Sequence, residues 1–115
     1  YIKDVKAMPL MDIVKKSKFK MIDLLQIDTE GFDYEVLKMF NFKIFKPILV
    51  QFEFIHLSKN DYKNSINLLS NNGYITIKKK NDIIAIKKNK INIILILYYL
   101  FFRSKDSMKS RFGFN

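Results

Sequence analysis

The chain has 115 residues and 49% hydrophobic content, which suits one small domain with a packed core. It has no cysteine and a single histidine, His56, so disulfides, thiolate chemistry and a multi-histidine metal site are excluded. The formal net charge is +10, but only Arg103 and Arg111 among the 21 basic residues are arginines. Arginine makes the bidentate contacts of nucleic-acid sites, and the joint abundance of lysine, isoleucine and asparagine matches A/T-rich codons. We therefore expect no nucleic-acid partner.

The first third of the chain predicts a helix, a strand and a second helix. Pro9 suits the first position of a helix, and lysines close that helix where they complement its dipole. An apolar run over 21–27 predicts a strand. A second helix is predicted over 33–40, with Asp28 or Thr29 as its candidate N-cap. Its expected apolar face comprises Phe32, Val36, Met39 and Phe40.

The middle of the chain predicts a second strand and a longer helix. The apolar run over 48–54 is typical of a parallel strand that is buried on both faces. Ser58 with Asp61 resembles a capping box at the start of the following helix. Asn72 and Gly73 favour a left-handed end for that helix.

Two short strands, over 74–77 and 83–86, flank a predicted hairpin turn at 80–82. The complete order of elements is α-β-α-β-α-β-β. Alternating strands and helices indicate the α/β class with a parallel sheet, and the terminal hairpin predicts one antiparallel strand at the edge of that sheet.

Residues 91–102 (INIILILYYLFF) form an apolar segment with basic flanks, which predicts an apolar C-terminal helix. Twelve residues span only about 18 Å as a helix, which is too short for a hydrocarbon core of about 30 Å. Two interpretations stay open. The helix packs on this domain or on a partner subunit, or it is an interfacial membrane anchor.

Four polar side chains follow the two central strands at the points where those strands end. Asp28 and Glu30 follow the first strand, and Glu53 and His56 lie at the end of the second. Because the carboxyl ends of neighbouring parallel strands meet at one edge, where open α/β sheets bind ligands, we expect a shared site. Such a cluster can position a hydroxyl and remove its proton, with repulsion among the carboxylates raising at least one pKa. It can also hold a hard divalent cation.

Each of these residues also has a structural interpretation. Asp28 can cap the following helix, and Glu30 can bond backbone amides in the turn. A lone histidine such as His56 is more often structural, whereas Glu53 is costly to bury without a partner, which favours a site role. Gly31 is expected to allow a backbone angle or a close contact rather than chemistry.

Four segments, taken in order, resemble the FkbM family of S-adenosylmethionine-dependent methyltransferases. They are IDLLQIDTEGFDYEVLKMF, KPILVQFEFIHLS, INLLSNNGY and NDIIAIKK, and they cover roughly residues 10–88. The first is the most specific, because a strand that ends in Ile-Asp-x-Glu-Gly and leads into a Glu-Val-Leu helix is the best-marked feature of that family.

The resemblance implies a Rossmann-like class I methyltransferase sheet of seven strands, of which this chain holds strands four to seven, with a hairpin that inserts one antiparallel strand. It implies S-adenosylmethionine as cofactor and methyl transfer to a hydroxyl of a sugar, a polysaccharide or a similar small molecule. Asp28, Glu30 and Gly31 match the loop after strand four, and Glu53 matches the acidic residue that ends strand five. The candidate catalytic residues are then Asp28, Glu30, Glu53 and His56, the candidate cofactor contacts are Asp28 and Gly31, and no metal ligand is assigned.

Nothing in the chain matches the family's glycine-rich loop after strand one or its acidic residue after strand two. We therefore expect residues 1–88 to form the C-terminal half of a methyltransferase domain within a longer protein, inactive alone, and 89–115 to form the apolar helix and a basic polar tail. The alternative is a non-catalytic remnant or interaction module whose C-terminal helix binds a membrane or a partner. We expect a cytoplasmic protein, with peripheral membrane contact or homo-oligomerisation through residues 91–102.

Overall fold

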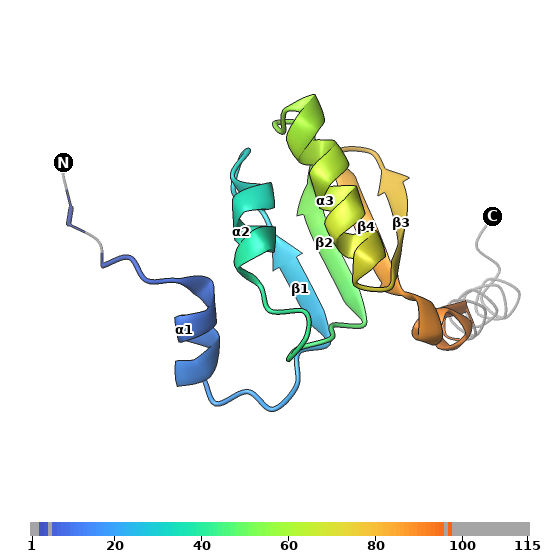
Figure 1. The fold of residues 1–115 in the computed structure, drawn as a ribbon, viewed down its shortest axis with the longest axis horizontal. Coiled ribbons are helices and arrows are strands. Elements are labelled where there is room, and N and C mark those ends of the chain that lie inside the picture. The colour runs from blue at the N-terminus through green and yellow to red at the C-terminus, as the bar shows by residue number, and fades with distance from the viewer. Residues whose placement is uncertain (1–2, 5, 96, 98–115) are drawn as a thin grey trace, which may run out of the picture.

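The computed structural model describes residues 3–4, 6–95 and 97. Its elements follow the predicted order (Figure 1): α1 (Leu10–Lys16), β1 (Leu24–Ile27), α2 (Asp33–Met39), β2 (Leu49–Glu53), α3 (Lys59–Asn71), β3 (Tyr74–Lys79), β4 (Asp82–Lys87) and a 3₁₀ turn, η1 (Lys88–Lys90). The alternating apolar periods and the turn residues thus specify every helix and strand, although β1 is shorter than predicted and the two hairpin strands are longer.

The four strands form one mixed sheet in the order β1-β2-β4-β3. β1 and β2 are parallel, as predicted, and β4 is antiparallel to both of its neighbours. The prediction that the antiparallel strand lies at the sheet edge is wrong, because the hairpin folds β4 between β2 and β3. One side of β4 pairs with β2, where Ile83 is opposite Phe52, and the other side pairs with β3. The edge strand is therefore β3. This arrangement agrees with the inserted strand that the family resemblance implies.

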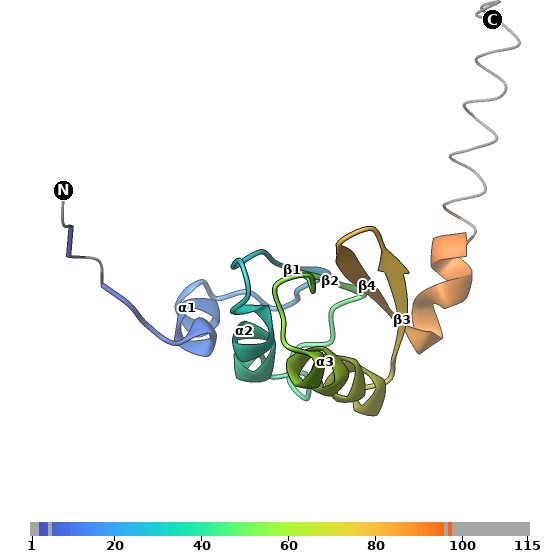
Figure 2. The same cartoon turned by 90° about the horizontal axis from the view of Figure 1, so that it is seen from above.

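Helices α2 and α3 cover one face of the sheet (Figure 2), and the core lies between them and the strands. Its buried members alternate along each strand, as the two-residue period of a strand requires. They are Ile27, Leu37, Phe40, Phe42, Val50, Phe52, Leu69, Tyr74, Ile83 and Ala85.

The other face of the sheet carries apolar side chains that α2 and α3 do not cover. The strand register places Leu24, Leu49, Ile86 and Ile75 in one row across this face. Leu24 is 52% exposed and Ile75 is 44% exposed. Within the described part of the chain, β2 is therefore buried on alternate residues only, and the prediction of a strand buried on both faces is wrong.

The predicted caps of α3 are confirmed. Ser58 is the N-cap, and its Oγ accepts a hydrogen bond of 3.1 Å from the backbone N–H of Asp61. Gly73, at φ +81°, follows the C-cap Asn72 in the left-handed conformation. For α2 the prediction is wrong, because Phe32 occupies the N-cap position and neither Asp28 nor Thr29 caps the helix.

The predicted apolar face of α2 is also wrong in part. Phe32 is 53% exposed and Met39 is 44% exposed, whereas Asp33 and Leu37 have no exposed surface. The helix is therefore rotated so that Asp33, Leu37 and Phe40 face the core. A carboxylate inside the core needs partners, and they lie at the candidate site.

Residues 91–95 continue from η1 as a helix. Ile93, Leu95 and Leu97 are between 51% and 60% exposed. The rest of the predicted 91–102 helix lies outside the described residues. Among the residues that the structure describes, no helix is long and apolar enough to span a membrane.

Candidate functional site

The carboxyl ends of the parallel strands β1 and β2 lie side by side. Ile27 is paired with Phe52, so the loop that begins at Asp28 emerges beside Glu53. This edge is where the topology of open α/β sheets places ligands. The pairing of β1 with β2 therefore brings the ends of the two strands together at the edge where the site was predicted.

His56 lies between two of the predicted carboxylates. Its Nε2 is 3.3 Å from Oε2 of Glu30 and 3.6 Å from Oε2 of Glu53. The Glu30 side chain is 79% exposed, His56 is 50% exposed and Glu53 is 20% exposed. The structure thus brings together three of the four candidate catalytic residues, on a surface that solvent and small molecules reach.

Asp28 is the fourth candidate, and it lies on the exposed start of the same loop. Its negative charge contributes to raising the pKa of Glu53, after larger contributions from burial and from Glu30. Asp28 therefore lies close enough to Glu53 for its charge to act on that carboxyl.

The loop between β1 and α2 is a tight turn with two residues in the left-handed region. Glu30 has φ +51° and Gly31 has φ +106°, and the N–H of Phe32 donates to the carbonyl of Thr29 at 3.3 Å. A Cβ on Gly31 would lie 3.2 Å from Cβ of His56 and 3.3 Å from its carbonyl oxygen. The prediction for Gly31, a backbone angle and a close contact, is confirmed, and the contact holds Glu30 next to His56.

Asp33 organises this edge, a role that was not predicted from the sequence. One oxygen of its buried carboxylate accepts hydrogen bonds from Oγ1 of Thr29 at 3.0 Å and from the N–H of Gly31 at 3.2 Å. The other oxygen accepts from the N–H of Glu53 at 3.2 Å. Asp33 therefore joins the turn after β1 to the end of β2. A signal was available, because Asp33 lies four residues before the core residue Leu37 and shares its helix face.

Glu53 has the most perturbed environment of the cluster. Burial raises the pKa of its carboxyl above the usual range, the charge of Glu30 raises it further, and His56 opposes the rise. Its Oε2 has almost no solvent contact and no hydrogen-bond partner among the described residues. A carboxylate with a raised pKa is a stronger base, so Glu53 is the best-placed proton acceptor at this edge.

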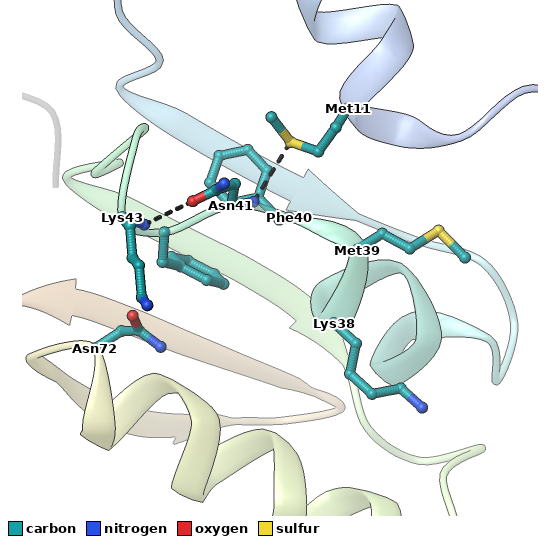
Figure 3. A pocket seen from close by; sticks show the side chains of 8 residues that line it. Met11, Lys38, Met39, Phe40, Asn41, Lys43 and Asn72 are labelled. Atoms are coloured by element: carbon teal, nitrogen blue, oxygen red, sulfur yellow. Dashed lines mark hydrogen bonds between the residues drawn. The ribbon is translucent and has the colours of Figure 1, made fainter.

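A hollow lies away from this edge, at the C-terminal end of α2 (Figure 3). Its volume is about 430 Å³, and its lining offers lysines, amides and apolar groups but no carboxylate: Met11, Lys38, Met39, Phe40, Asn41, Phe42, Lys43 and Asn72. Within it the N–H of Asn41 donates to Sδ of Met11 at 3.4 Å. The contact between Asn41 and Met11 joins α1 to the end of α2, and the lining of the hollow has no carboxylate or imidazole.

A second hollow of about 400 Å³ lies next to the candidate site. The chain between Glu53 and His56 forms one wall, and α3 and β3 form the others; the lining residues are Phe54, Ile55, Leu57, Lys59, Tyr62 and Lys78. The rings of Phe54 and Tyr62 lie 5.4 Å apart, and the Nζ of Lys78 lies 4.4 Å from the Phe54 ring centroid. An aromatic, partly basic hollow thus adjoins the cluster.

The fold and the edge cluster define a small α/β domain with a mixed four-strand sheet, a form compatible with α/β methyltransferases. The family model of the methyltransferase FkbM domain matches residues 1–76. The chain belongs to this family of methyltransferases, and the resemblance seen in its sequence is confirmed. No curated protein and no solved structure matches the chain.

Proposed function

We propose that this chain forms the acceptor-side part of an S-adenosylmethionine-dependent O-methyltransferase that acts on a hydroxyl of a sugar, a polysaccharide or a similar small molecule. The observation that carries the proposal is the carboxylate and imidazole cluster at the paired ends of β1 and β2 in a member of this family. Ligands bind at this edge in open α/β sheets.

The charges of the site suit such a reaction. S-adenosylmethionine supplies an electrophilic methyl group on a cationic sulfonium. Asp28, Glu30 and Glu53 make the edge negative, which favours a cation beside it. Asp28 and Gly31 are the proposed contacts to the cofactor, because they lie on the loop after β1.

The chain's own residues have separate tasks in this proposal. Glu53, with its raised pKa, accepts the proton of the acceptor hydroxyl, Asp28 positions that hydroxyl, and His56 assists. Asp33 keeps the two loops together so that the reacting groups stay in register. The neighbouring aromatic hollow at Phe54 and Tyr62 is of a size that fits one sugar-sized acceptor.

We further propose that residues 1–88 correspond to strands four to seven of the larger sheet and that the cofactor-binding half lies on other chain segments. The free edge of β1 and the uncovered apolar face of the sheet support this proposal. Surfaces of this kind are normally paired or covered in a folded protein. Residues 89–115 would then be a C-terminal appendage of the enzyme, which we place in the cytoplasm.

A second candidate is an interaction module without catalysis, in which the C-terminal segment binds a partner or a membrane. The exposed side chains of Ile93, Leu95 and Leu97 favour it. Flotation with anionic liposomes at two salt concentrations separates the two kinds of partner. Salt-sensitive flotation indicates a membrane, whereas self-association without flotation indicates a protein contact.

The test of the proposed function is methyl transfer by the natural polypeptide that contains this chain. The protein is incubated with methyl-labelled S-adenosylmethionine and a panel of hydroxyl acceptors, and labelled methyl ethers are measured. Label on an acceptor hydroxyl is expected. Cofactor binding without any labelled product on sugars or polysaccharides would contradict the acceptor class.

A further inference from the structure

Three side chains, one from the loop after β1, one from the end of β2 and one from the loop after β2, bring one ligand atom each close together. One oxygen of Glu30, one oxygen of Glu53 and one ring nitrogen of His56 lie within 4.8 Å of one another. The separations from Nε2 of His56 are 3.3 Å and 3.6 Å. Atoms bound about 2.1 Å from one ion lie about 3.0 to 3.5 Å apart when they are neighbouring ligands. The two separations from His56 are therefore close to those of neighbouring ligands on one ion.

An independent observation is the state of the inner oxygen of Glu53. Oε2 of this residue has almost no contact with solvent and no hydrogen-bond partner among the described residues, and it faces His56. The imidazole of His56, 3.6 Å away, is too distant to donate a good hydrogen bond to this oxygen, so the carboxylate is incompletely satisfied, which costs free energy. A bound cation lowers that cost, because it supplies a close partner from the side where His56 lies.

The donor set decides which cations fit. Ca²⁺ and Mg²⁺ take oxygen ligands almost exclusively, whereas an imidazole nitrogen beside two carboxylates suits Mn²⁺, Fe²⁺, Co²⁺ or Zn²⁺. We propose that Glu30, Glu53 and His56 bind one divalent transition-metal ion at the edge of the sheet. The exposed sides of Glu30 and His56 leave the remaining coordination positions open to water or to a hydroxyl.

The scaffold around the three ligands keeps them in place before the ion arrives. Asp33 bonds both the turn that carries Glu30 and the backbone N–H of Glu53. Gly31 packs against His56 at a distance that excludes a side chain. Ligands held by such outer contacts lose little freedom on binding. With the ion bound, Glu53 and His56 are its ligands and are not free to accept a proton, so ion binding is separate from the proton-acceptor role proposed above, does not depend on methyl transfer and stands even where the methyl acceptor is different.

Calorimetric titration of the complete chain with MnCl₂ and with ZnCl₂, after dialysis against a chelator, tests the proposal. One ion per chain is expected. Glu53→Gln and His56→Gln should each weaken binding by at least about tenfold. Glu30→Gln should do the same, and because this side chain is 79% exposed its loss of binding cannot come from unfolding.

Glu35→Gln is the matched control, because Glu35 is a half-exposed glutamate that pairs with Lys38 on α2. It should bind the ion as the unsubstituted protein does. Mn²⁺ should also broaden the amide NMR signals of the Asp28–Gly31 loop and of His56 first. Binding that all four variants retain, broadening spread over other carboxylates, or equal affinity for Mg²⁺ would overturn the proposal.

Discussion

The two faces of the sheet are built from alternate residues of the same strands, yet they differ in solvent exposure and in whether helices cover them. On one face Val50 and Phe52 have no exposed surface and pack under α2 and α3. On the other face Leu24 and Ile77 are about half exposed, at 52% and 50%. Within the described residues, helices therefore cover one face of the sheet only. The other face keeps an exposed row of apolar side chains, of a kind that is usually covered in a folded protein.

One substitution on each face of the sheet should show the difference between the faces as a difference in the free energy of unfolding. Phe52→Ala removes a fully buried ring and should lower the free energy of unfolding by about 3–5 kcal/mol. Leu24→Ala removes a side chain that is half in water already, and it should cost less than about 1 kcal/mol in the 115-residue chain. Urea unfolding followed by circular dichroism measures both. Equal losses would mean that the second face is packed in solution.

Asp33 tests the covered face in a different way, because it is a charge inside the core layer. Asp33→Ala leaves the hydroxyl of Thr29 and two backbone N–H groups without their partner, so a loss of about 2–4 kcal/mol is expected. The control is Glu35→Gln, two residues further along α2, where the side chain is about half exposed. It should change the free energy of unfolding by less than about 0.5 kcal/mol. The same measurement decides, and a small effect at Asp33 would show that the two loops hold together without it.

Tyr74 supplies a test of the covered face by pH. Burial raises the pKa of its phenol from the ordinary 10.0 to about 12, and its hydroxyl donates to the carbonyl of Pro47 at 2.7 Å. The neutral phenol is favoured by folding, so its contribution is present below pH 10 and is lost as the pH rises toward 12. The contribution is up to about 2 kcal/mol.

The neighbouring group in that titration is Lys87, whose Nζ lies 4.5 Å from the Tyr74 ring centroid. Burial lowers the pKa of Lys87, so this residue gains stability as the pH rises and works in the opposite sense. Tyr74→Phe removes only the titrating hydroxyl group and keeps the ring. Chemical unfolding from pH 9 to pH 12 should therefore show a steeper loss for the unsubstituted chain, and parallel curves would contradict the burial of this hydroxyl.

The smallest expected effect on stability is at the N-cap of α3, which lies on neither face of the sheet. Ser58→Ala removes the side-chain cap of α3 and should cost about 1 kcal/mol. Ser70→Ala is the control on the exposed last turn of the same helix and should be nearly neutral. Thermal unfolding of the two variants compares them directly. No difference between them would mean that the cap at Ser58 is replaced by water at little cost.

Local signals were enough to predict the order of elements and the place of the site. The capping pair Ser58 and Asp61 begins α3 and the left-handed Gly73 follows its end, and both signals are read from neighbours in sequence. The convergence of Glu30, Glu53 and His56 followed from one rule, that parallel strands align their carboxyl ends.

What the sequence did not predict depends on contacts between distant residues. The insertion of β4 beside β2 requires Phe52 to pair with Ile83, and no local pattern distinguishes this from pairing at the edge. The role of Asp33 depends on the N–H of Glu53, 20 residues away. The apolar run of β2 predicted two covered faces, and only one cover lies within the described residues.

The central claim is that the turn after β1 serves methyl transfer and is more than a connection between a strand and a helix. The most direct test measures kcat and the free energy of unfolding together for Asp28→Asn in the natural polypeptide. We expect kcat to fall at least about 100-fold, because the acceptor hydroxyl is no longer positioned, and stability to change by less than about 0.5 kcal/mol, because Asp28 is exposed and caps no helix. An unchanged kcat, or a loss of activity that matches a loss of folding, would contradict it.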